Sequence, residues 1–347
     1  MNSSRACLDT LSVAIPQPLE KQGIICFGHN HHNLSVEDVD YRIKADAMMA
    51  AEQKQYEMLW NILEEAELSS QNAPENQKTF YIFVEQTRTI FPEADVVRQR
   101  IIEGLLYYSA NRAFKRTMVV NGDARKLCNI AYQILMLEKL HFLQILGHQS
   151  EKKKHPVADC YVHLLTFEDL IKEFHTLYQQ MSSFRDSWEN TRIQQEFNAD
   201  LGYALTFFRD LEKEIELIGP GRTILEFAES LHCKHAHEYR TNLAGLILHT
   251  FCRFLDLYVY QHILLLKGQP IEKILVFAGT GHIENLVYHH LCDEHHRVFS
   301  KVDKAINNTR SIDQEELDKI KKPFIQYVAE EFPDVMAPQR ASCCSLL

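Results

Sequence analysis

Positive charge is scarce in this 347-residue chain, which carries 37 lysines and arginines against 47 aspartates and glutamates. Its one basic run, Lys152–Lys154, follows Glu151 and comes just before Pro156, as in a solvated linker. A protein that tracks a nucleic-acid backbone needs a basic stripe. The net charge of −10 therefore argues against a nucleic-acid partner.

Cysteine pairs of the kind that staple small folds or bind zinc are also missing. The nine cysteines are scattered without a Cys-x-x-Cys pair, and several lie in apolar runs, among them Cys26, Cys128 and Cys252. This pattern is typical of reduced thiols in an intracellular protein. Hydrophobic residues make up 46% of the chain, enough for a core that folds without disulfides or a structural metal.

Targeting segments and several well-known catalytic motifs are absent as well. Residues 1–19 lack a basic segment followed by an apolar core, so no secretory signal is expected. We find no P-loop, GxGxxG, GxSxG or HExxH motif. The longest apolar stretch, 243–266, is predicted to be a buried helix and not a membrane span, because it contains His249, Arg253, Asp256 and His262.

Short apolar runs and longer helical patterns alternate along the chain. The apolar runs predict strands at 23–27, 79–84, 117–120 and 273–278, with an edge strand at 297–302. Helical patterns occupy 36–68, 93–114, 123–146, 159–266 (broken at 219–221), a segment from 282, and 313–331. The order predicts an α/β fold: a mainly parallel sheet flanked by helices, with an all-helical insertion before the last strands.

The same pattern divides the chain into five segments. We expect a flexible N-terminus (1–20), a first α/β half (21–150), a helical insertion (151–268), a second α/β half (269–332) and a flexible tail (333–347).

Polar side chains follow all four predicted parallel strands. Ligands bind beyond the carboxyl ends of such strands. Two of the strand ends share a Gly-x-x-His spacing, in which the glycine lets the chain turn sharply off the strand and the histidine lies over the sheet edge. The candidate residues, in strand order, are Gly28–His32, Glu85, Asp123 with Arg125, and Gly279–His282.

Two imidazoles and a carboxylate suit zinc, manganese or a similar divalent ion with a position left open for water. An ion held in this way activates water for hydrolysis. The alternative is that each strand end carries ordinary polar loop residues.

These motifs resemble the Tiki/TraB/ChaN-like superfamily, which includes GumN-type and erythromycin-esterase-like proteins. The segment 273–291 is similar to its late strand–GxGH–helix unit, and Arg240–Asn242 to its Arg-Asn helix start. The resemblance implies a metal-dependent hydrolase site, proteolytic in Tiki-type members; other members bind haem or have no settled activity.

Carried over residue by residue, the resemblance makes His31, Glu85 and His282 metal ligands or acid/base groups. It makes Asp123, Arg125 and Arg240 their catalytic supports. Two departures stand out: His29 and His32 flank His31, so that His29 is a further candidate ligand, and one residue separates Asp123 from Arg125.

The last residues, Cys343–Leu347, end in a C-a-a-X sequence at Cys344 whose terminal leucine favours a geranylgeranyl group. One lipid binds membranes only marginally, so palmitoylation of Cys343 is the expected second signal. The tail is like that of host-prenylated bacterial effectors. We therefore expect the cytosolic face of a eukaryotic membrane, one route to it being delivery by an intracellular bacterium; with an unmodified tail we expect the cytoplasm.

Two classes of function remain open at this point. The first is a membrane-tethered hydrolase of a peptide, amide or ester bond, acting on a protein or peptide substrate. The second is a non-catalytic protein on the same membrane, either an adaptor that binds a partner through the helices of 159–266 or a protein that binds haem or another ligand.

Overall fold

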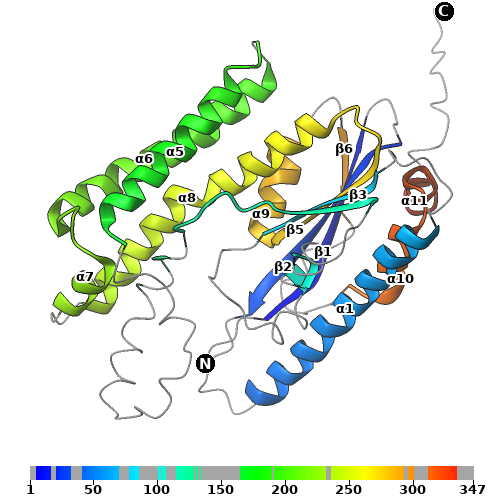
Figure 1. Cartoon of the computed structure of the whole chain (residues 1–347), viewed down its shortest axis with the longest axis horizontal. Coiled ribbons are helices and arrows are strands. Elements are labelled where there is room, and N and C mark those ends of the chain that lie inside the picture. Colours follow the sequence, from blue (N-terminus) through cyan, green and yellow to red (C-terminus); the bar gives the residue numbers. More distant parts are fainter. Residues whose placement is uncertain are drawn as a thin grey trace, which may run out of the picture.

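The computed structural model describes most of the chain: residues 5–16, 21–32, 41–69, 78–85, 101–102, 104–106, 115–128, 130–131, 134, 165–189, 191–231, 236–292, 296–300 and 312–333. Its six-stranded sheet has the order β4-β3-β5-β2-β1-β6 (Figure 1). The strands are β1 (Arg5–Pro16), β2 (Gly23–His32), β3 (Lys78–Val84), β4 (Thr117–Asn121), β5 (Ile271–Gly279) and β6 (His296–Ser300).

The four strands from β4 to β2 are mutually parallel, whereas β1 runs antiparallel to both β2 and β6. The α/β fold with a mainly parallel sheet is thus confirmed. Parallel strands that are covered on both faces are nearly continuous apolar runs. This is true of β5, where Ile274–Ala278 are all buried.

The N-terminus corrects the sequence-based prediction, because β1 occupies much of the segment expected to be flexible. Leu11, Val13 and Ile15 alternate with smaller residues and are buried against the helices on one face of the sheet. This period of two is the signature of a strand. Ser12 and Ala14 make the run only weakly apolar, which hides the alternation in the sequence.

Gly28 also differs from expectation, because the chain does not turn there and β2 continues to His32. The glycine is needed for a close approach instead. Gly28 pairs with Thr10 next to an irregularity in the β1 register, and a Cβ at position 28 would lie 1.8 Å from Thr10 Oγ1.

Helices cover both faces of the sheet (Figure 1). The first face packs against α1 (Tyr41–Ser69), α10 (Gln314–Asp318), the 3₁₀ turn η3 (Lys319–Lys321) and α11 (Phe324–Glu331). Pro323 interrupts the single helix predicted over 313–331. The second face packs against α8 (Ala236–Leu266), α9 (Thr280–Asn285) and the π-helix η2 (Leu286–His290). The helices α5 (Phe167–Arg185), α6 (Arg192–Ile218) and α7 (Ile224–Ser230) join the same hydrophobic cluster from the side of α8 that faces away from the sheet.

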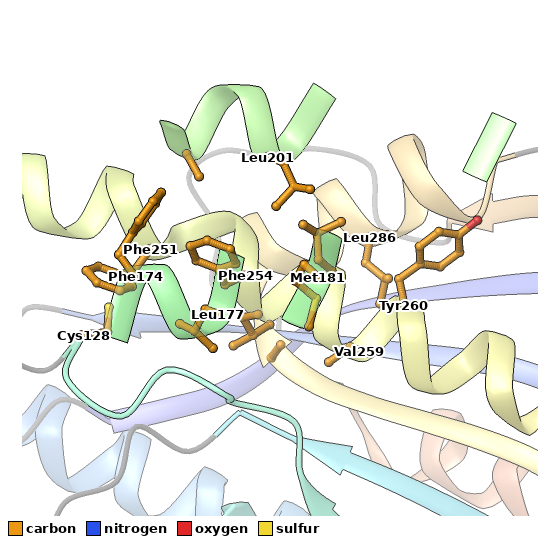
Figure 2. Packing of buried hydrophobic residues seen from close by; sticks show 14 of the residues in the cluster. Cys128, Phe174, Leu177, Met181, Leu201, Phe251, Phe254, Val259, Tyr260 and Leu286 are labelled. Carbon is orange, nitrogen blue, oxygen red and sulfur yellow. The ribbon is translucent and has the colours of Figure 1, made fainter. Parts of the chain in front are cut away.

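Every described element between β4 and β5 is a helix, and local sequence signals set the limits of these helices. Thr166 and Asp169 form a capping box before α5, and Thr191 caps α6. Gly219 ends α6 with a φ of 101°, a conformation that favours glycine. Figure 2 shows how Phe174 of α5 packs with Phe251 and Phe254 of α8.

Helix α8 is the one described helix that is long and apolar enough to cross a membrane. However, 61% of its most apolar 18-residue stretch is buried inside the fold, in agreement with the predicted buried helix.

The segment after β4 is an irregular loop with bends and a turn, where the sequence predicted a helix from residue 123. The first described helical residues after β4 are 130–131 and 134. Asp123 accepts a hydrogen bond from the backbone N–H of Arg125, and Glu173 of α5 accepts from those of Lys126 and Leu127. These carboxylates satisfy backbone donors that a helix would leave unpaired in its first turn.

Candidate functional site

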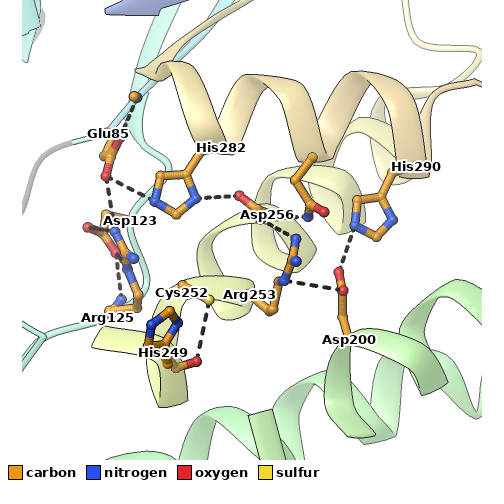
Figure 3. A network of polar contacts seen from close by, with 12 residues as sticks. Glu85, Asp123, Arg125, Asp200, His249, Cys252, Arg253, Asp256, His282 and His290 are labelled. Carbon is orange, nitrogen blue, oxygen red and sulfur yellow. Dashed lines mark hydrogen bonds and ion pairs between the residues drawn. The ribbon is translucent and has the colours of Figure 1, made fainter. Parts of the chain in front are cut away.

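The residues after the parallel strands converge at one edge of the sheet, with Glu85 at the centre (Figure 3). Glu85 directly follows β3, and its backbone N–H still pairs with Phe277 of β5 at 2.8 Å. This fixes its carboxylate against the end of β5, where the backbone N–H of Gly279 donates to Oε2 at 2.7 Å. The side chain is only 12% exposed.

Arg125 is the cation that braces Glu85 from the β4 loop. Its Nε and one terminal nitrogen bind the two oxygens of Asp123 at 2.7 and 2.9 Å. The same terminal nitrogen donates to Glu85 Oε1 at 3.1 Å. Because the Asp123 carboxylate is fully buried, it acts as an anchor that aims the guanidinium at Glu85.

Two imidazoles face the remaining sides of Glu85. His282 lies in the first turn of α9, with Nε2 3.5 Å from Glu85 Oε1, and His29 on β2 places Nε2 3.9 Å from Oε2. Burial of Glu85 opposes its ionisation, but His282, Arg125 and His29 outweigh that effect and lower the pKa of Glu85 to about 2. The carboxylate is therefore a permanent anion at neutral pH.

His282 is held from behind by Asp256 of α8, whose Oδ1 lies 2.6 Å from His282 Nδ1. Burial of the His282 ring disfavours its charged form, but Asp256 and Glu85 outweigh this and raise its pKa. Asp256 Oδ2 also accepts a hydrogen bond from Asn285 at 2.7 Å. The histidine thus lies between two carboxylates, one on each ring nitrogen.

The first histidine motif is brought to the site through His29. The backbone of His31 lies on β2 opposite Ala6, but its side chain is outside the described part of the chain. The same holds for the side chain of His32.

Arg240 is not brought to the site. It precedes Asp256 on α8 by 16 residues, or about 24 Å of helix. An arginine side chain cannot span that distance, so Arg240 is no partner of Glu85 or His282. It is buried near the start of α8.

A second network of charges adjoins the site on the side of α6 (Figure 3). His290, at the end of η2, contacts Asp200 at 2.9 Å through Nε2 and Glu196 at 3.8 Å through Nδ1. Arg253 lies between the networks, 3.7 Å from Asp200 and 3.9 Å from Asp256. The helical region and the strand-end site are thereby linked by charged side chains.

The donor atoms around Glu85 fit a divalent ion in chemistry and spacing. Two ligand atoms of a tetrahedral zinc stand about 3.3–3.5 Å apart, close to the 3.5 Å between His282 Nε2 and Glu85 Oε1. Within the described residues, no three His, Cys, Asp or Glu side chains have the arrangement of a complete metal site.

Asp256 is the site residue that the strand-end search missed, because it lies on a helix far from any strand end. Its signal in the sequence was a carboxylate within the apolar stretch 243–266. In the sequence that charge argues against a membrane span. A carboxylate kept inside a buried helix needs a partner, and here the partner is His282.

Comparison with known proteins yields no match: no family model, no curated protein and no solved structure matches this chain. The resemblance to the Tiki/TraB/ChaN-like superfamily therefore rests on the strand-end motifs themselves.

Proposed function

We propose that the strand-end cluster is the active site of a metal-dependent hydrolase of Tiki/TraB-like type, acting on a peptide, amide or ester bond of a protein or peptide substrate. The ligands are Glu85 and His282 together with His29, and His31 by its position on β2. The observation that carries the proposal is the pair of atoms His282 Nε2 and Glu85 Oε1, 3.5 Å apart.

That pair needs a positive charge between its two atoms. When His282 donates its Nδ1 proton to Asp256, a neutral ring presents the Nε2 lone pair to the Glu85 carboxylate. Two lone pairs repel at this distance unless a proton or a metal cation lies between them. A zinc- or manganese-type ion satisfies both atoms at once.

The charge state of each residue then determines its role in the proposed hydrolysis. A bound ion would supply an activated water and polarise the scissile carbonyl. Glu85, with a pKa of about 2, is too weak a base to take a proton from water and is suited to the role of ligand. Arg125, anchored by Asp123, provides a fixed cation for the oxyanion that develops on the substrate.

Elemental analysis of the purified protein tests this function. We expect about one zinc or manganese ion per chain in the wild type and in the control His289→Ala, which removes an exposed histidine on η2. His282→Ala should keep its fold by circular dichroism and lose the ion, because one ligand is gone. A wild type without metal, and without a rise in melting temperature on adding zinc or manganese, would overturn the proposal in favour of an adaptor.

We further propose that a geranylgeranyl group on Cys344, supported by palmitoylation of Cys343, tethers the protein to the cytosolic face of a eukaryotic membrane, as in a bacterial effector inside a host cell. Both cysteines lie outside the described residues, and the sequence of the last four positions carries the proposal. In eukaryotic cells the wild type should fractionate with membranes and Cys344→Ser should move to the cytosol. Identical partitioning of the two would contradict the tether.

A further inference from the structure

Asp256 is a buried carboxylate that joins the helical region to the strand-end site. It lies two-thirds of the way along α8, and its side chain is 2% exposed. An ionised carboxylate so deep in a fold is costly unless its oxygens are paired. Both oxygens are paired with residues of one segment: Oδ1 with His282 and Oδ2 with Asn285.

The two partners lie three residues apart on α9 and therefore face the same way. The orientation of the Asn285 amide is fixed in this pairing, because its N–H₂ group can donate to a carboxylate oxygen and its own oxygen cannot. The bond from Asn285 thus holds the Asp256 carboxylate in place, with the other oxygen directed at His282 Nδ1. At 2.6 Å this contact is a short, charge-assisted hydrogen bond.

The consequence for His282 is a fixed ring orientation and a fixed tautomer. An ionised carboxylate only accepts hydrogen bonds, so Nδ1 must carry a proton. The other nitrogen, Nε2, is then the one free to bind a cation, and it is the nitrogen that faces Glu85 at 3.5 Å. Without Asp256 the ring could flip or carry its single proton on Nε2, which would block that position.

We propose that Asp256 is a positioning residue of the candidate site: it holds His282 with the proton on Nδ1 and Nε2 directed at Glu85. The helical region then provides an outer shell for the strand-end site and is not an independent appendage. This inference rests on the proposed function, since Nε2 is significant as the atom that binds a metal ion. Metal-binding histidines are commonly held by a carboxylate in this way, and loss of that carboxylate weakens metal affinity about 10–100-fold.

The fold contains a natural control for this proposal in Asp200 and His290. Theirs is also a buried histidine–carboxylate pair, 2.9 Å apart, and it also joins a long helix to the α9–η2 segment. Arg253 lies at nearly equal distances from Asp200 and Asp256. Since the ion pairs of His290 are with α6 and not with Glu85, Asp200→Asn disturbs a comparable pair without touching the candidate ligands.

The experiment compares Asp256→Asn with Asp200→Asn. An asparagine at 256 replaces one of the two carboxylate oxygens with an N–H₂ group, so that either His282 or Asn285 faces a donor in place of its acceptor. By calorimetric titration with zinc alone, Asp256→Asn should raise the Kd about 10–100-fold, and Asp200→Asn should leave it within about threefold. Equal shifts in the two variants, or none in Asp256→Asn, would overturn the role of Asp256.

A second measurement separates failure of this proposal from failure of the proposed function. Nitrogen-15 spectra of the metal-free protein, recorded at a pH where the ring is neutral, report which ring nitrogen of His282 carries the proton. We expect Nδ1–H in the wild type and in Asp200→Asn, and loss of that preference in Asp256→Asn. If the wild type binds no zinc, the metal site fails, but these spectra still decide whether Asp256 sets the tautomer. A wild-type ring protonated at Nε2 alone would overturn the proposal.

Discussion

Replacing Arg125 with methionine is expected to destabilise the protein by about 3–5 kcal/mol, the cost of removing one partner from a buried ion pair. The Arg125 side chain is 4% exposed and makes the side-chain contacts that balance Asp123, whose carboxylate is fully buried. Methionine fills similar space but leaves the Asp123 carboxylate with a single donor, the backbone N–H of residue 125. Chemical denaturation of both proteins measures the difference.

A surface arginine provides the matched control for Arg125. Arg185 forms an ion pair of the same length with Asp186, 2.7 Å, but the partner carboxylate is well exposed. Arg185→Met should therefore cost at most about 1 kcal/mol. The double variant Asp123→Asn/Arg125→Met should lose less stability than the sum of its single changes, because it no longer buries an unpaired charge. Equal losses in Arg125→Met and Arg185→Met would show that burial does not set the strength of the pair.

The central strands could be predicted from the sequence because burial on both faces leaves a continuous apolar run. The predicted strand at 79–84 became β3 and that at 273–278 became β5, with one to three more residues. Strand β1 was missed because its alternating pattern contains small residues and because one of its two pairing partners, β6, is remote in the chain. The helix predicted from Asp123 begins too early, since its first described helical residues are 130–131 and 134; Asp123 and Glu173 accept from the backbone N–H groups of residues 125–127 before it.

The sequence predicted those residues of the candidate site whose place follows from the order of the strands alone. Glu85, Arg125 and His282 directly follow parallel strands, whose carboxyl ends share one edge of the sheet. The sequence predicted His31 as the ligand because a turn at Gly28 would bring its ring over the sheet edge; β2 continues through Gly28 instead, and the described histidine of this motif beside Glu85 is His29. The sequence also could not exclude Arg240. That residue lies far from the site because it stands near the start of α8, whereas the contact with His282 is made further along the same helix, at Asp256.

The two halves of the site depend on carboxylates from the helical region. Glu173 of α5 holds the loop that carries Arg125, and Asp256 of α8 holds His282. Neither residue follows a strand, and neither would be found by searching strand ends. The helices of 165–266 therefore do more than complete the core: they fix the geometry of the residues around Glu85.

The outermost part of this charged network predicts a pH dependence of stability. Burial of His290 disfavours its charged form, but the hydrogen bond to Asp200 and the nearby carboxylate of Glu196 outweigh that effect and raise its pKa from 6.5 to about 9. The folded state thus binds the proton more tightly than the unfolded chain does. The stabilisation is fully present below pH 6.5 and is lost as the pH rises through 9. The ring is 2% exposed, so the contribution is not reduced by solvent and amounts to about 3 kcal/mol.

The measurement is the difference in unfolding free energy between the wild type and His290→Gln across this range of pH. Taking the difference cancels groups common to both proteins, such as Lys273, whose pKa burial lowers to about 8. The stability gap should shrink by about 3 kcal/mol between pH 6.5 and 10. For His289→Gln, which alters the exposed neighbour of His290, the gap should stay constant. A constant gap for His290→Gln would mean that the ring is uncharged between Asp200 and Glu196. The link from α6 to the strand-end site would then be a neutral hydrogen bond and not an ion pair.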